Sequence, residues 1–255
     1  MTFLEGQNPR VIAHRGLALD HPENTLGAFT AALNSGADIL ETDVHLSKDG
    51  SVIVAHDPDL TRVAGRLGLV ADFSERELAE IDLGSGEGFP TLDQLLSQFP
   101  HAKFNIDLKT RTAVEPFAEI IRAHRAESRI LATSFDEPTR QAVINLLPEV
   151  ASSTSRSMVI QARLRTWLGL PMEKWTVPAE VVALQIPPAM YGVALVTPSM
   201  LRLAKRKGLE VHVWTINNPE DMRRLWTMGV HGIVTDRSDL AVEVRGELFP
   251  EVTLG

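Results

Sequence analysis

The run Arg10–His14, RVIAH, is a short apolar stretch rich in β-formers that ends on an ionisable side chain. Seven similar runs follow, with helical-looking segments between them: DILETDV (38–44), KFNIDLK (103–109), RILAT (129–133), VASST (150–154), VVALQI (181–186), EVHVWTI (210–216) and GIVTD (232–236). Strands that alternate with helices indicate βαβ units and a parallel sheet. Eight such strands in 255 residues predict a closed (β/α)₈ barrel, the TIM barrel fold.

The alternative to a barrel is an open, doubly wound α/β sheet. That fold often carries a Gly-rich dinucleotide turn after its first strand, and this sequence has none there. Helix signals fit between the strands: Asn24 or Thr25 as an N-cap with Gly36 as a stop, and Thr197 with Pro198 before Gly208. The Gly- and Pro-containing excursion at about 57–92 is too long for one helix. We therefore predict a single barrel domain over 1–255 with a small insertion after the second strand.

Composition excludes several classes of site and partner. The chain has no cysteine, so it cannot form a disulfide, a thiolate nucleophile or a Cys-ligated zinc site. A net charge of −8 argues against nucleic acid and against broad binding to anionic membranes, although local basic pockets remain compatible with it. The N-terminus lacks a signal-peptide pattern, and no apolar run approaches the roughly 20 residues of a membrane span. We expect a cytoplasmic protein without stable membrane insertion.

The second predicted strand places carboxylates inside the barrel. Side chains alternate along a strand, so Glu41, Asp43 and His45 share one face with Ile39. Two unpaired carboxylates in a barrel core would cost several kcal/mol each. A hard divalent cation would offset that cost.

The residues after this strand predict a hairpin that returns to the barrel mouth. Asp49-Gly50 lies between two alternating runs, which is typical of a two-residue hairpin turn. With Asp49 and Gly50 in the turn, Asp43 lies opposite His56. Directly opposed residues share a face of the sheet, so this register brings an imidazole beside the carboxylates.

Further polar side chains end the first and third predicted strands. Asn105, Asp107 and Lys109 share one face, while His14 points inward and Arg15 begins the following loop. Active sites of barrels form at the C-terminal ends of the strands. Mg²⁺ and Ca²⁺ prefer oxygen ligands such as these carboxylates. The arginine and lysine can bind a phosphoryl group, and the two imidazoles can act as general acid and general base. The combination predicts chemistry on a phosphodiester.

These residues resemble the glycerophosphodiester phosphodiesterase family. The family pattern H-R-G, P-E-N-T, E-x-D-V, D-G, H-D, E-x-K and W-T-x-N is similar to the following segments: His14-Arg15-Gly16, Pro22-Glu23-Asn24-Thr25, Glu41-Thr42-Asp43-Val44, Asp49-Gly50, His56-Asp57, Asp107-Leu108-Lys109 and Trp214-Thr215-Ile216-Asn217. The similarity extends to FPTLDQLL (89–96) and GIVTDRSD (232–239), so it covers nearly the whole chain. It implies a (β/α)₈ barrel with an insertion after the second strand.

The resemblance also implies roles for individual residues. It implies a divalent cation, Mg²⁺ or Ca²⁺ with Mn²⁺ as a further candidate, held by Glu41, Asp43 and Asp107. His14 and His56 would be the acid and base pair, and Arg15 and Lys109 would bind phosphate. Glu23 would brace the site, and Trp214 would either pack in the barrel or form a wall for the glycerol end. Asp107 stands where the family usually has glutamate, and His212 stands where an apolar residue is expected.

The leading hypothesis is hydrolysis of a small glycerophosphodiester to glycerol 3-phosphate and an alcohol. One alternative is a phospholipase D-like action on lysophospholipids, and another is a non-catalytic binder of phosphorylated polyols. Segment 163–181, with Trp167 and Trp175, is interpreted as a helix packed on the barrel or as an apolar rim for an acyl chain. The rim would favour lysophospholipids.

Overall fold

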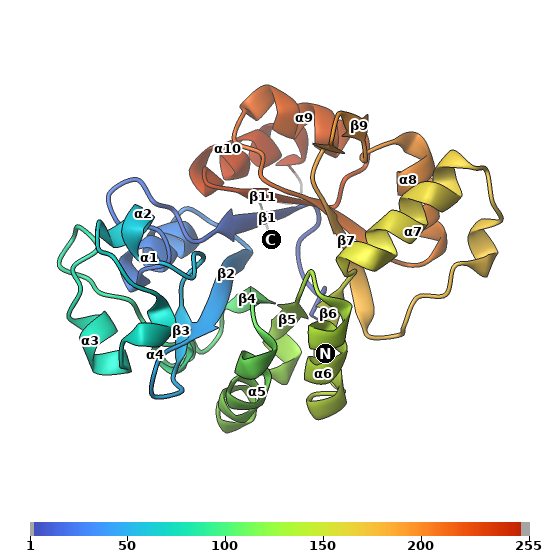
Figure 1. The fold of residues 1–255 in the computed structure, drawn as a ribbon. Coiled ribbons are helices and arrows are strands. Elements are labelled where there is room, and N and C mark those ends of the chain that lie inside the picture. Colours follow the sequence, from blue (N-terminus) through green and yellow to red (C-terminus); the bar gives the residue numbers. More distant parts are fainter. Residues whose placement is uncertain (1–2, 251–255) are drawn as a thin grey trace.

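Eight parallel strands close into a barrel in the computed structural model, which describes residues 3–250 (Figure 1). The barrel strands are β1 (Arg10–His14), β2 (Ile39–Leu46), β4 (Lys103–Leu108), β5 (Ile130–Thr133), β6 (Ala151–Ser153), β7 (Val181–Ile186), β10 (Glu210–Val213) and β11 (Gly232–Thr235). Pairing of β1 with both β2 and β11 closes the ring. The TIM barrel prediction is confirmed, and the run expected at 210–216 ends earlier, at Val213.

Helices surround the barrel, and their caps follow the sequence signals. The larger ones are α1 (Leu26–Asn34), α4 (Leu92–Gln98), α5 (Val114–Ala123), α6 (Glu137–Leu146), α7 (Arg156–Trp167), α8 (Pro198–Arg206), α9 (Pro219–Thr227) and α10 (Ser238–Leu248). The Thr25 side chain accepts from the backbone N–H of Ala28 and caps α1, and Thr197 caps α8 in the same way. Within residues 3–250, no helix has the length and apolar character that crossing a membrane requires.

Side-chain alternation along the strands separates the outer core from the barrel interior. Leu40, Val44, Phe104, Ile106 and Leu108 pack outward in the main hydrophobic core. In the interior, an apolar cluster includes Phe3, Ile12, Ile39, Leu131 and Val234. The inward polar residues of β2 and β4 follow this cluster toward the C-terminal ends of the strands, as the period of two predicts.

The hairpin after β2 differs from the predicted one by one residue. Strand β3 (Val52–Val54) pairs antiparallel with β2, and Val44 lies opposite Val54. Ser47 pairs with Ser51, so the turn contains three residues, 48–50, and Gly50 adopts a φ of +88°. Asp43 therefore lies opposite Ala55, not opposite His56. The two-residue turn was wrong because a three-residue loop with a left-handed glycine also fits an Asp-Gly sequence.

The insertion between β3 and α4 has a small core of its own. It contains the short helices α2 (Thr61–Ala64), η1 (Val70–Asp72) and α3 (Glu75–Ala79). Leu60, Val70 and Leu78 are buried there against Ile53 of β3. The insertion thus forms one wall beside the barrel mouth and carries Arg62 toward it.

His212 of β10 is fully buried in the barrel, where its Nδ1 lies 3.5 Å from Gln185 Nε2. Its Nε2 lies 3.0 Å from Glu210 Oε2, and Arg10 Nε donates to the same carboxylate at 2.8 Å. Burial opposes ionisation of Glu210, but these hydrogen bonds outweigh it and lower the pKa of Glu210 to about 2. A polar residue is tolerated at this expected apolar position because Glu210 satisfies it.

Candidate active site

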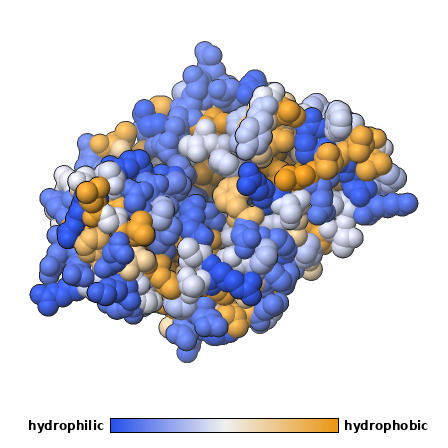
Figure 2. All heavy atoms as spheres, viewed as in Figure 1, coloured by the Kyte–Doolittle hydropathy of each residue, from blue (hydrophilic) through white to orange (hydrophobic). Residues whose placement is uncertain are grey.

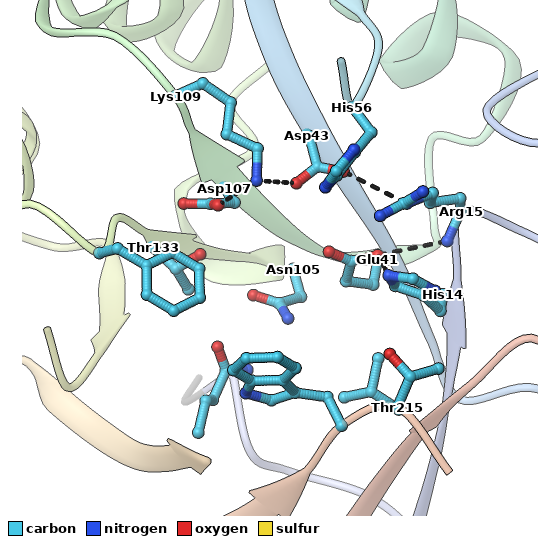
Figure 3. Close-up of a pocket in the computed structure, with 14 residues that line it drawn as sticks. His14, Arg15, Glu41, Asp43, His56, Asn105, Asp107, Lys109, Thr133 and Thr215 are labelled. Carbon is cyan, nitrogen blue, oxygen red and sulfur yellow. Dashed lines mark hydrogen bonds and ion pairs between the residues drawn. The ribbon is translucent and has the colours of Figure 1, made fainter. Parts of the chain in front are cut away.

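A pocket of about 210 Å³ opens at the C-terminal ends of the strands (Figure 3). Its lining residues come from several strands and the loops after them: His14, Arg15, Glu41, Asp43, His56, Asn105, Asp107, Lys109, Thr133, Phe135, Gln185, Trp214, Thr215 and Val234. The structure therefore brings together every residue predicted at the site except Glu23. Glu23 lies behind the lining, where its Oε1 accepts from Arg15 Nη1 at 3.0 Å.

Three buried carboxylates and one ammonium group form the floor of this pocket. Lys109 Nζ lies 2.6 Å from both Asp43 Oδ1 and Asp107 Oδ2. Burial opposes the charge of Lys109, but the two carboxylates raise its pKa above the ordinary value. Burial and the neighbouring charge of Asp43 raise the pKa of Glu41 to about 8. Burial also raises the pKa of Asp107. Arg15 Nε also lies 3.6 Å from Asp43 Oδ2. The raised pKa values mean that this floor disfavours ionisation of all three carboxylates together.

His14 is held by a carboxylate at the end of β11. Its Nδ1 lies 2.6 Å from Asp236 Oδ1, and Asn217 Nδ2 donates to Asp236 Oδ2 at 2.7 Å. The other ring nitrogen, Nε2, lies 3.9 Å from Glu41 Oε2. Burial disfavours the imidazolium, but the hydrogen bond to Asp236 and the charge of Glu41 outweigh it and raise the pKa of His14. His14 is thereby oriented with Nε2 toward the carboxylates.

His56 also has a carboxylate partner of its own, Asp57. Its Nδ1 lies 2.7 Å from Asp57 Oδ1, and Arg62 Nε donates to Asp57 Oδ2 at 2.5 Å. Arg62 also donates to both oxygens of Glu23, at 2.9 and 2.7 Å. Because Glu23 also accepts from Arg15, these ion pairs connect His56 to the arginine of the His14 loop.

Arg15 reaches the pocket through a left-handed turn after β1. Arg15 has a φ of +58° and Gly16 a φ of +86°. A Cβ on Gly16 would lie 2.7 Å from the backbone carbon of Ala28 in α1. The glycine is therefore required both by its φ and by the close approach of α1.

Gly16→Ala is expected to destabilise the protein by about 2–4 kcal/mol, because it adds a backbone collision to the cost of a left-handed alanine. The matched control is Gly50→Ala, since Gly50 has a φ of +88° but no heavy atom within 4 Å of the position that a Cβ would take. The free energy of unfolding of that control should fall by only about 1 kcal/mol. Urea unfolding of both variants measures the difference, and equal losses would contradict the collision.

Sequence reasoning missed the residues that support the two histidines. Asp57, Asn217 and Asp236 lie inside recognised motifs, and Asp236 directly follows β11 at the active end of the barrel. That position was the available signal for Asp236. Arg62 carries no comparable signal, because it lies on a four-residue helix of the insertion.

The floor has the donor chemistry of a hard cation site. Asp43 Oδ2 and Asp107 Oδ1 are buried without a hydrogen-bond partner, and Glu41 has its raised pKa beside them. Carboxylate oxygens are the ligands that Mg²⁺ and Ca²⁺ prefer. As the side chains stand, residues 3–250 contain no three His, Asp or Glu groups arranged around one metal position. Lys109 bridges Asp43 and Asp107, so its ammonium would have to move before both could bind one cation.

The family assignment follows from comparison with known proteins. Residues 14–240 match the glycerophosphoryl diester phosphodiesterase family. This chain belongs to that family. A Mycobacterium tuberculosis protein described as "Probable glycerophosphodiester phosphodiesterase 2" is 35% identical over 250 residues, covering 96% of this chain and 95% of the relative. The family assignment makes the chain a phosphoric diester hydrolase.

Two further relatives are a solved structure and a lysophospholipase D. The crystal structure of glycerophosphodiester phosphodiesterase from Agrobacterium tumefaciens is 27% identical and superposes with a TM-score of 0.77, covering 96% of this chain and all of that one. A lysophospholipase D from Rattus norvegicus is 27% identical over 268 residues, covering 89% of this chain and 82% of the relative.

Proposed function

We propose that this chain cleaves glycerophosphodiesters to glycerol 3-phosphate and an alcohol, with the help of a divalent cation. The observation that carries the proposal is the pair of histidines, each hydrogen-bonded to its own carboxylate, at one pocket with Arg15 and Lys109. Membership of the family supports the reaction class. The pocket volume of about 210 Å³ suits a small phosphodiester.

In this mechanism the two histidines divide the proton transfers. Asp236 accepts from His14 Nδ1 and raises the pKa of His14, so we assign His14 as the proton donor to the departing alkoxide. His56 accepts the proton of the attacking hydroxyl as its oxygen bonds to phosphorus and the P–O bond to the departing alcohol breaks. Attack by water gives glycerol 3-phosphate directly, and attack by the neighbouring glycerol hydroxyl gives a cyclic phosphate that water then opens. Arg15 and Lys109 supply positive charge for the phosphoryl oxygens.

Glu41, Asp43 and Asp107 would hold the cation, and we propose Mg²⁺ or Ca²⁺, with Mn²⁺ as a further candidate. When bound, such a cation would act as a Lewis acid toward the phosphoryl oxygens. The buried oxygens of Asp43 and Asp107 that lack a hydrogen-bond partner support this assignment, although Asp43 Oδ2 also lies 3.6 Å from Arg15 Nε. Asp107 reaches less far than the glutamate usual in the family, so the strand-to-cation distance constrains which cation fits.

Asp236→Asn is expected to lower kcat/KM by about 10–100-fold, because the amide holds His14 less firmly and does not stabilise the imidazolium. The loss of Asp236 lowers the pKa of His14, so the alkaline limb of the pH profile should move to lower pH. Asp239→Asn is the control, since Asp239 pairs only with Arg237 outside the pocket among the described residues. An unchanged alkaline limb in Asp236→Asn would count against His14 as the proton donor.

The reaction itself is tested by following glycerophosphocholine with ³¹P NMR. We expect the diester signal to be replaced by that of glycerol 3-phosphate. Phosphocholine as the product would mean that the other P–O bond is cut and would contradict the proposal. Binding of the diester without any cleavage would favour the non-catalytic binder.

A second candidate substrate class is favoured by a cavity next to the active site. This cavity of about 330 Å³ shares Phe135, Gln185 and Trp214 with the active-site pocket, and Val159 and Met190 add apolar lining. It could accommodate part of an acyl chain, and the lysophospholipase D relative is consistent with such a substrate. Val159→Trp would fill the cavity, so it should lower choline release from lysophosphatidylcholine while sparing glycerophosphocholine. Equal effects on both substrates would exclude this use of the cavity.

A further inference from the structure

Helix α7 exposes an apolar stripe that no other part of residues 3–250 covers. Ile160, Leu164, Trp167 and Leu168 recur at helical spacing, and each is about half exposed or more, with Trp167 at 69%. The opposite face of α7 packs on the barrel through Met158, Val159 and Ala162. The interpretation of segment 163–181 as one packed helix was wrong, because α7 ends at Trp167 and only a short 3-10 helix (Met172–Lys174) follows. Trp175 is buried, as expected of packing on the barrel, whereas Trp167 is exposed.

Arginines flank this stripe, and the surrounding sequence is basic. Arg156, Arg163 and Arg165 lie on α7, and none pairs with a carboxylate in the part of the chain that the structure describes. Residues 156–209 contain eight Lys or Arg and two Asp or Glu, whereas the whole chain has a net charge of −8. The charge of this region is thus opposite to that of the rest of the molecule.

The stripe lies on the same side of the molecule as the barrel mouth. Figure 2 shows apolar side chains along α7 in the view that also looks into the barrel. The hairpin of β8 (Ala189–Met190) and β9 (Val193–Ala194) exposes Tyr191, at 89%, and Val193. Arg156 and Val159 of α7 and Met190 of β8 line the cavity that adjoins the active site. An apolar, basic surface therefore borders the entrance to the site.

We propose that α7 and the β8–β9 hairpin, called here the docking face, bind the surface of a membrane that contains anionic phospholipid. The stripe would enter the interface between headgroups and acyl chains, and the arginines would lie among the phosphates. A helix with one apolar face and a cationic border is the arrangement that lies in the plane of such an interface. Tyr191 and Trp167 are side chains that favour this depth.

A second copy of the chain is a poorer partner for the docking face. A twofold dimer buries the same patch from both subunits, so it would bring the α7 arginines of one copy close to those of the other. No carboxylate of α7 would offset this repulsion, because the helix contains no Asp or Glu. Anionic headgroups complement the charge instead.

The experiment measures sedimentation of the full chain with vesicles, using phosphatidylcholine vesicles with and without phosphatidylglycerol. We expect the protein to bind the vesicles that contain phosphatidylglycerol and to be released by high salt. Leu164→Glu should lower the partition coefficient at least about tenfold, and Arg163→Glu by about tenfold. Leu67→Glu is the matched control, because Leu67 is 85% exposed on the insertion and the charge change is identical to that of Leu164→Glu.

Each alternative result would overturn the proposal. Absence of binding to vesicles with phosphatidylglycerol would do so, and so would an equal loss in Leu67→Glu. A dimer in sedimentation velocity that Leu164→Glu dissociates would instead assign the docking face to a second copy. Circular dichroism checks that the variants are folded, and vesicle binding does not depend on the proposed hydrolysis, so failure of one leaves the other testable.

Discussion

Replacement of His14 with alanine is expected to lower kcat by about 10²–10⁴-fold, the usual contribution of a positioned acid or base. His14 ends β1 and points its Nε2 toward Glu41, while Asp236 holds the opposite nitrogen at 2.6 Å. Alanine removes both the proton that the alkoxide needs and the group that places it. Substrate binding through Arg15 and Lys109 should persist, so KM should change much less than kcat.

This result requires a control for general effects of removing a histidine. His101→Ala is suitable, because His101 is exposed and lies outside the pocket. It should leave kcat unchanged, and both variants should unfold within a few degrees of the unsubstituted chain. If His14→Ala retained more than about a tenth of kcat, His14 would not be the proton donor.

Glu41→Gln is expected to abolish most activity and yet stabilise the metal-free protein. The folded-state pKa of Glu41, about 8, lies above its ordinary value of 4.5, so the free energy of unfolding falls as pH rises between these values. A neutral glutamine does not ionise, so the stability of the variant does not fall with pH in this way. Near pH 8 we expect its free energy of unfolding to exceed that of the unsubstituted chain by an amount on the order of 2 kcal/mol. The loss of a cation ligand should lower kcat/KM by roughly 10²–10³-fold.

Urea unfolding at pH 5 and at pH 8 measures the stability change of Glu41→Gln. The gain should be small at pH 5 and larger at pH 8, and added Mg²⁺ or Ca²⁺ should reduce it by stabilising only the unsubstituted chain. Asn105→Asp is an informative companion, since it adds a carboxylate to the same floor and should destabilise at high pH. An equal gain in the free energy of unfolding at both pH values would show that the pKa of Glu41 is not raised in the folded protein.

Side-chain alternation explains why so much of the site was predictable. Once β2 and β4 are recognised as barrel strands, a period of two places Glu41, Asp43 and Asp107 inside, and the order of the strands places them together. The parallel register confirms this directly, because Asp43 lies opposite Asp107 on the neighbouring strand. The motifs around His14 and His56 then predicted the remaining residues of the site.

The features that the sequence did not predict depend on loop geometry and on contacts between residues far apart in sequence. The hairpin register was wrong by one residue because turn length is not fixed by Asp-Gly alone. Nevertheless, His56 reaches the pocket, because it lies beyond the end of β3, where the pairing register no longer decides its direction. Asp236 contacts His14 across 222 residues of sequence, and only closure of the barrel between β1 and β11 brings them together.

The central claim, metal-dependent hydrolysis of a glycerophosphodiester, is tested most directly by one assay. Metal-stripped protein is incubated with glycerophosphocholine, Mg²⁺, Ca²⁺ or Mn²⁺ is added back separately, and release of glycerol 3-phosphate is measured. We predict no release from the stripped protein, restoration by at least one cation, and no restoration in His14→Ala. Full release from the stripped protein, or none with any of the three cations, would contradict the account.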